Sequence, residues 1–216
     1  MSPVADSRKQ VLERIRAATQ GPGAQDCTPL ADGPARAYLR RGSLSAEARL
    51  ELMAERLREY DAAVAECRPE ELAATIHAQL NASGRRSFVA PAGLPAEWLR
   101  PGFDWKIDGD LPVAEIENAD GVVTACSCAI AESGTIALHH GAWEGRRVVS
   151  LLPDWHLCIV RADQIVETLP EYFDRFEDSP ALVTWISGPS ATADIEMTRI
   201  RGVHGPRFLN VILVKD

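Results

Sequence analysis

The chain has 216 residues, of which 46% are hydrophobic and 25% are charged, and this composition indicates a globular protein with one main core. Its 31 acidic and 23 basic residues give a formal net charge of −8, which argues against a nucleic-acid partner. No apolar run approaches the roughly 20 residues that cross a bilayer, and the first residues form no hydrophobic signal segment. A cytoplasmic protein without a membrane partner is therefore expected.

The N-terminal part predicts helices joined by an irregular arm. Apolar residues recur at helical spacing over 3–18, and Gly and Pro then follow at close intervals over 21–42. Such an arm is compatible with exchange between the subunits of a homodimer. A second amphipathic helix is predicted over 43–67, where Ser45 resembles a cap, and a third ends near Gly84.

After residue 84, short apolar runs rich in β-branched residues alternate with Gly, Pro and Asp turns, which is typical of strands. Because several runs are apolar on both faces, they suit a sheet covered by helices on both sides. A helix is expected at 161–176, and strands at 87–90, near 113–116, and at 121–125, 135–138, 147–152, 156–160, 181–186 and 208–214. The pattern predicts an α/β three-layer fold, with N-terminal helices and arm in 1–83 and the sheet domain in 84–216, as one structural unit.

The five cysteines, at positions 27, 67, 126, 128 and 158, are odd in number and scattered, so reduced thiols are expected. Cys126 and Cys128 would point the same way in a strand and, with His139 or His140, could hold zinc. Burial in the core explains them more simply, and no metal is predicted. The chain has no C-x-x-C repeat, no dinucleotide-binding fingerprint and no P-loop, so no cofactor is predicted. Any electron transfer would then pass through a partner.

Three polar clusters, at 131–135, 187–196 and 202–206, follow apolar runs. Because ligands settle at the carboxyl ends of strands in open α/β sheets, these clusters predict one shared pocket for a small anionic ligand. The candidate catalytic residues are Glu132 and His204. The candidate ligand-binding residues are Ser133, Gly134, Thr135, Gly188, Ser190, Thr192, Asp194 and Glu196.

The apolar residues around Glu132 predict a buried carboxylate, which requires either hydrogen bonds or a functional role. It could act as a base or nucleophile beside the Ser133–Thr135 amides, or it could simply cap a glycine turn. Ser190 or Thr192 could cap a helix N-terminus that binds an anion, or cap it without a ligand. His204 is either an acid, base or ligand, or ordinary polar surface.

Four segments together resemble the lactate-utilisation protein C family, whose domain is called the LUD domain: AESGTIAL, LPDWHLCIVRADQIV, SGPSATADIE and GVHGPRFLNVILV. The resemblance covers roughly residues 84–216. It implies a Rossmann-like fold similar to the sugar-phosphate isomerase and coenzyme A transferase group. It also implies a component of L-lactate oxidation to pyruvate that acts with iron–sulfur partner proteins, and it leaves open whether the chain is itself an enzyme.

Two other functions stay open at this point. The fold resemblance implies a coenzyme A transferase-like or isomerase-like enzyme in which Glu132 is the reactive carboxylate. A regulatory module that binds a small anion without turnover is the third reading. The family pattern commonly has Thr and Arg where this chain has Ser133 and Ala191. Serine keeps the hydroxyl, whereas Ala191 removes a guanidinium that could hold a carboxylate.

Overall fold

The computed structural model of the protein describes residues 3–19, 39–176, 178, 180–192, 200–201 and 205–215. The chain divides into two units, residues 1–38 and residues 39–216. Helix α1 (Pro3–Thr19) belongs to the first unit and confirms the predicted N-terminal helix. Its apolar residues Val11, Leu12 and Ile15 are exposed.

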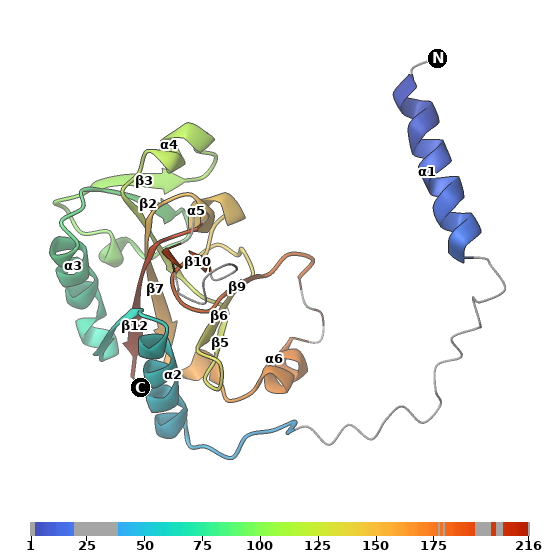
Figure 1. Cartoon of the computed structure of the whole chain (residues 1–216). Coiled ribbons are helices and arrows are strands. Elements are labelled where there is room, and N and C mark those ends of the chain that lie inside the picture. The colour runs from blue at the N-terminus through green and yellow to red at the C-terminus, as the bar shows by residue number, and fades with distance from the viewer. Residues whose placement is uncertain are drawn as a thin grey trace. The chain divides into compact units, whose positions relative to one another are not determined.

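Within the described part of the second unit, six parallel strands form the main sheet, in the order β1-β12-β7-β4-β2-β3 (Figure 1). Alternate residues of β7 enter two different apolar clusters, Leu157 and Ile159 on one face and Cys158 and Val160 on the other. Both faces of the sheet are therefore buried, which confirms the three-layer prediction. The strands are β1 (Ala63–Cys67), β2 (Ser87–Pro91), β3 (Asp104–Asp108), β4 (Gly121–Ala125), β7 (Trp155–Arg161) and β12 (Phe208–Val214).

Helices cover the two faces of this sheet. Helix α3 (Leu72–Ala82) packs with the cluster that contains Leu157 and Ile159. Helix α2 (Ala46–Glu59) covers the opposite face, and Figure 1 shows the two helices on different sides of the strands. The short helices α4 (Val113–Glu117) and α5 (Arg147–Leu151) pack over β2 and β4.

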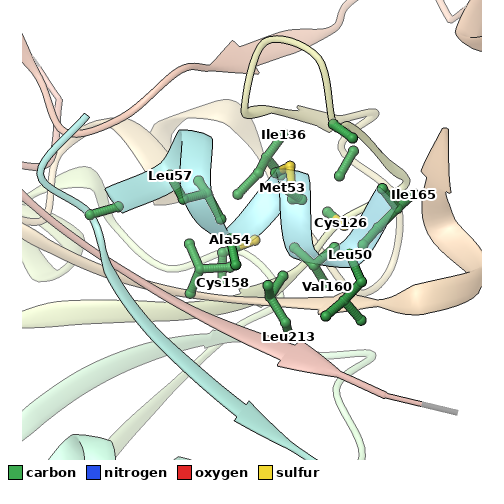
Figure 2. Packing of buried hydrophobic residues seen from close by; sticks show 14 of the residues in the cluster. Leu50, Met53, Ala54, Leu57, Cys126, Ile136, Cys158, Val160, Ile165 and Leu213 are labelled. Atoms are coloured by element: carbon green, nitrogen blue, oxygen red, sulfur yellow. The ribbon is translucent and has the colours of Figure 1, made fainter. Parts of the chain in front are cut away.

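Helix α2 forms because its residues satisfy both a cap and an apolar face. The Ser45 side chain accepts a hydrogen bond from the Ala48 amide at 3.2 Å, which caps the first turn. Leu50, Met53, Ala54 and Leu57 recur every three or four residues, are buried, and face the strands in Figure 2.

A second, smaller sheet packs beside α2. Among the described residues it has the order β8-β5-β6-β9, in which β5 is parallel to β8 and antiparallel to β6, and β6 is antiparallel to β9. Its strands are β5 (Cys128–Ile130), β6 (Thr135–Leu138), β8 (Ile165–Val166) and β9 (Thr184–Ile186). The remaining elements are α6 (Leu169–Arg175), the antiparallel pair β10 (Ala191–Thr192) and β11 (Ile200–Arg201), and three 3-10 turns, η1 (Pro69–Glu71), η2 (Ala96–Trp98) and η3 (Ala162–Gln164).

The prediction of a helix over 43–67 is wrong at its C-terminal end. The helix stops at Glu59, Asp61 adopts a positive φ of 63°, and residues 63–67 form β1. Every residue of β1 pairs with β12, from Ala63 opposite Asn210 onward. Val64 continues the helical spacing of apolar residues, but pairing with the distant strand β12 outweighs this local pattern.

Three other predicted elements differ from the structure. Residues 113–117 and 147–151 form short helices rather than strands, because each places only one face against the main sheet. The helix predicted at 161–176 is divided, since η3 and β8 precede α6. Strands β3, β5 and β8 have no counterpart in the sequence prediction.

The division of the chain at residue 84 stays a prediction, although β1, which precedes it, lies in the same sheet as β12, which follows it. Across the described residues, no helix is both long and apolar enough to span a membrane.

The packing of α2 predicts a specific loss of stability. Leu57 is fully buried, and replacing it by alanine leaves a cavity, so Leu57→Ala is expected to lower the free energy of unfolding by about 2–5 kcal/mol. Leu44 is 37% exposed, and Leu44→Ala is expected to change it by only about 0.5 kcal/mol. Urea denaturation of both variants measures the difference. Equal losses of unfolding free energy in the two variants would contradict the burial of Leu57 against the sheet.

Candidate functional site

The Glu132 turn connects β5 and β6, whose last pair is Ile130 opposite Thr135. The Gly134 amide donates to the Ala131 carbonyl at 3.3 Å, and the Glu132 amide donates to the Glu167 carbonyl at 3.0 Å. Gly134 has a positive φ of 61°, and a Cβ atom there would lie 2.8 Å from Cβ of Arg56 in α2. Only glycine fits both the turn and this contact.

Glu132 itself is exposed, so the expectation of a buried carboxylate is wrong. The apolar residues before and after it belong to the buried strands β5 and β6, whereas the turn leaves the sheet. Among the described residues, no hydrogen bond or ion pair engages the Glu132 carboxylate. The carboxylate therefore does not act as a cap of its own turn and is available to solvent or to a ligand.

A chain of hydroxyl groups joins the first predicted cluster to the second. Oγ of Ser133 lies 2.8 Å from Oγ1 of Thr135, which in turn lies 2.8 Å from Oγ of Ser187. Ser187 directly follows β9, and β9 pairs with β6 through Ile186 opposite Ile136. The second sheet thus brings together segments that lie far apart in the sequence.

The second cluster also depends on a glycine that packs against α2. Gly188 has a positive φ of 82°, and a Cβ atom there would lie 2.6 Å from Cβ of Tyr60. The Ser190 amide donates to the Pro206 carbonyl at 2.8 Å, which connects the second cluster to the third. Ala191–Thr192 forms β10, so no helix begins directly after Ser190, and a helix capped by Thr192 would lie outside the described residues.

Three predicted site residues, Asp194, Glu196 and His204, lie outside the described residues. Their inclusion in one pocket with Glu132 stays a prediction. The topological reason given for that pocket is wrong, however. The 131–135 turn and the 187–190 loop follow strands of the second sheet, and residues 205–206 precede β12 rather than follow a parallel strand.

Two neighbouring depressions are lined by five of the predicted site residues, namely Glu132, Ser133, Thr135, Gly188 and Ser190, whereas Gly134 and Thr192 line neither of them. The first has a volume of about 510 Å³ and an apolar wall around the polar turn; it is lined by Ile130, Glu132, Ser133, Thr135, Leu169, Phe173, Trp185 and Ser187. The second, which we call the His156 pocket, has a volume of about 370 Å³ and includes residues 184–191, Gly205 and Pro206. Trp185 and Ser187 border both depressions.

His156 is a polar residue that sequence reasoning treated only as part of a strand. It is 0% exposed in β7, and its Nε2 lies 2.8 Å from Oγ1 of Thr124 on β4. No described atom hydrogen-bonds to its Nδ1. Burial lowers the pKa of His156 to about 4, so the imidazole is neutral at pH 7. A histidine inside the apolar run 155–160 was the signal that could have identified it.

Glu144 is a second buried polar residue that the sequence analysis missed. It is 3% exposed and accepts hydrogen bonds from the Ser127 hydroxyl and the Gly141 amide. These bonds hold the 139–145 loop against the segment that follows β4. We assign Glu144 a structural role, because both carboxylate oxygens are occupied by groups of the chain itself.

The cysteine and histidine residues near this loop have other partners. Burial raises the pKa of the Cys128 thiol to about 11, and the neighbouring Cys158 thiol together with burial raises the pKa of Cys126. Nε2 of His139 lies 2.7 Å from the Tyr172 hydroxyl, and Nε2 of His140 lies 2.8 Å from Oγ1 of Thr184. In the part of the chain that is described, no three potential metal ligands come together. The absence of metal stays a prediction, which elemental analysis would test.

Comparison with known proteins gives consistent matches. The family model of the LUD domain matches residues 102–214. Lactate utilization protein C of Deinococcus radiodurans is 40% identical over 216 residues, which cover 97% of this chain and 96% of that protein. Lactate utilization protein C of Bacillus subtilis is 36% identical over 124 residues, 54% of this chain and 51% of that protein. The crystal structure of a DUF162 family protein from Deinococcus radiodurans is similar with a TM-score of 0.68 and 41% identity, covering 80% of this chain and 99% of that one.

The neutral state of His156 predicts a pH dependence of stability. The folded protein keeps this imidazole unprotonated down to a pH of about 4, whereas the unfolded chain takes up a proton near 6.5. Acidification from pH 7.5 to 5 therefore favours the unfolded state by about 2 kcal/mol through this residue alone. The variant His156→Gln lacks this titrating group, so acidification does not destabilise it in this way. The difference in unfolding free energy between the wild type and the variant is therefore expected to be about 2 kcal/mol smaller at pH 5 than at pH 7.5. Parallel stability curves for the two proteins, measured by urea denaturation at each pH, would contradict the prediction.

Proposed function

The chain belongs to the lactate utilization protein C family of LUD domain proteins, and on this basis we propose that it is a component of L-lactate utilisation. The observation that carries the proposal is the similarity to the Deinococcus radiodurans relative over 97% of this chain. In the proposed role the protein takes part in the oxidation of L-lactate to pyruvate. That reaction releases two electrons and two protons.

The electrons are proposed to pass to iron–sulfur partner proteins. The sequence contains no cysteine framework for a cluster of its own, which is consistent with a division of labour between subunits. In this division the present chain contributes a site for the small carboxylate, and its partners contribute the redox centres. A stable complex with such partners is the physical consequence that can be measured.

The proposed site on this chain extends from Glu132 and the hydroxyl chain between Ser133 and Ser187 into the His156 pocket. The exposed carboxylate lies in the same depression as these hydroxyls, and the Gly188 turn leads from it to the His156 pocket. Polar groups held in place by two glycine turns suit the positioning of a small polar ligand. We include Gly134, Gly188, Ser190, Thr192, Asp194 and Glu196 in this site as proposed ligand contacts, and His204 as a proposed catalytic residue.

A second candidate function has one observation in its favour. The Glu132 carboxylate is exposed, is not engaged by any described residue, and borders a depression of about 510 Å³. These properties are compatible with a nucleophile that attacks the thioester carbonyl of an acyl-coenzyme A and releases the thiolate of coenzyme A. The thiolate then attacks the resulting anhydride at its glutamyl carbonyl, which gives a glutamyl thioester on the protein and releases the original acyl group as its free carboxylate.

The lactate role predicts a growth phenotype. Deletion of the gene is expected to abolish growth with L-lactate as the sole carbon source, and a wild-type copy is expected to restore it. A copy with Glu132→Gln, which removes the charge but keeps the shape, is expected to fold normally and to restore little growth. Glu97→Gln is the matched control, because Glu97 is also exposed but lies in η2, away from both depressions.

The same strains test the partner proteins. Affinity purification of the tagged wild-type chain from lactate-grown cells is expected to recover proteins with the absorbance of iron–sulfur clusters. Normal growth of the deletion strain on L-lactate would contradict the proposed function.

The transferase candidate predicts covalent labelling. Incubation with acyl-coenzyme A followed by borohydride would reduce a glutamyl thioester to an alcohol, and peptide mass spectrometry would locate the change at Glu132. The Glu132→Gln protein is expected to show no such product. An unmodified wild-type protein, tested with acetyl- and propionyl-coenzyme A, would count against this candidate.

A further inference from the structure

The His156 pocket lies over the amino-terminal ends of β7 and β12, where helix α5, residues 184–191 and residues 205–206 meet. Helix α5 contributes Arg147, Ser150 and Leu151, and the segment from Thr184 to Ala191 forms the opposite wall. His156 and Leu209 come from the main sheet. Its volume of about 370 Å³ is in the range of small-molecule sites.

Nδ1 of His156 is a buried polar atom that lacks a partner among the described residues. An unsatisfied buried polar group is destabilising, so such atoms are rarely left without a hydrogen-bond partner in folded proteins. The imidazole is neutral and its Nε2 contacts Oγ1 of Thr124, which can either donate or accept. Nδ1 is therefore either a donor or an acceptor. A ligand hydroxyl suits both states because it can accept and donate.

Arg147 supplies a positive charge to the same pocket. Its neighbour Arg146 is held by Asp108, with Nη2 2.6 Å from Oδ1, and by the Leu111 carbonyl at 2.8 Å. Arg147 has no such side-chain partner in the described part of the chain. Among the described residues that line the pocket, no carboxylate opposes it. A guanidinium in this setting binds a carboxylate through two parallel hydrogen bonds.

The other polar groups of the pocket are partly engaged already. The Ser150 hydroxyl donates to the Arg147 carbonyl at 3.2 Å, and the Thr184 hydroxyl contacts Nε2 of His140. Leu151, Ile186 and Leu209 add apolar surface. The lining therefore combines one cation, one unsatisfied neutral imidazole and an apolar wall.

We propose that the His156 pocket binds a small 2-hydroxycarboxylate, with the carboxylate on Arg147 and the 2-hydroxyl group on Nδ1 of His156. The carboxylate and hydroxyl follow from the pocket itself, whereas the choice of a three-carbon acid as the first probe rests on the proposed lactate function. Neither Arg147 nor His156 is among the residues that the sequence pattern selected.

Isothermal titration calorimetry of the full chain tests this assignment with three probes: L-lactate, propionate and inorganic phosphate. Propionate has the carboxylate but not the hydroxyl, so it leaves Nδ1 unsatisfied and is expected to bind at least about 10-fold more weakly than L-lactate. Equal binding of the two acids, tighter binding of phosphate, or no binding of L-lactate would overturn the proposal.

Two variants separate the pocket from other parts of the surface. Arg147→Gln is expected to weaken L-lactate binding at least about 10-fold. Arg100→Gln removes another exposed arginine, outside both depressions, and is expected to bind as the wild type does. Equal losses in the two variants would show a general charge effect and would overturn the proposal.

A spectroscopic readout tests His156 without altering it. In protein labelled with ¹⁵N-histidine, the Nδ1 signal of His156 is expected to shift with L-lactate and to stay in place with propionate. Its assignment comes from the signal that is missing in His156→Gln, or from through-bond experiments if that variant does not fold. If the Nδ1 signal does not change at saturating L-lactate, the proposed hydrogen bond between His156 and the ligand hydroxyl is wrong.

Growth distinguishes failure of this proposal from failure of the lactate role. A deletion strain that grows normally on L-lactate would reject the pathway role while leaving the measured binding intact. Conversely, if deletion abolishes growth but the wild-type chain shows no L-lactate binding, the pocket assignment is wrong and the pathway role stands.

Discussion

Two turns with left-handed glycines approach helix α2 so closely that a side chain at either position would collide with it. Gly134 lies against Arg56, and Gly188 lies against Tyr60. Because both turns rest on one rigid helix, the residues next to each glycine take fixed positions relative to each other. The contact between Thr135 and Ser187 and the separation of the two depressions depend on this constraint.

Helix α2 can serve as this support because its opposite side is anchored in the core. Leu50, Met53 and Leu57 pack on strands of the main sheet and on the second sheet at the same time. The helix thus fixes the two turns of the smaller sheet relative to the main sheet. Loss of packing under α2 is expected to disturb the site together with the stability of the protein.

The two depressions differ in chemistry although they share Trp185 and Ser187. The one around Glu132 has an exposed carboxylate and an aromatic wall, which suits reaction or contact with a partner. The His156 pocket has a cation and a buried neutral imidazole, which suits selection of a small acid. A ligand held in the second pocket would lie one loop away from the carboxylate in the first.

Local pattern was sufficient for the parts of the fold that neighbouring residues decide. The apolar runs at 121–125, 135–138 and 208–214 are strands with the predicted limits, and Ser45 begins the predicted helix, because alternation and capping involve residues close in sequence. The family motif also selected the turn at 131–135 and the loop at 187–190.

Tertiary contacts decided the rest. Residues 63–67 are a strand only because β12 lies beside them, and residues 147–151 are a helix because a single face meets the sheet. Glu132 is exposed because the turn leaves two buried strands, although its neighbours in sequence are apolar. His156 has an unsatisfied nitrogen, and Arg147 faces the same pocket, because strand order and helix placement bring them together. These properties depend on pairings between distant segments, which the spacing of residues along the chain does not record.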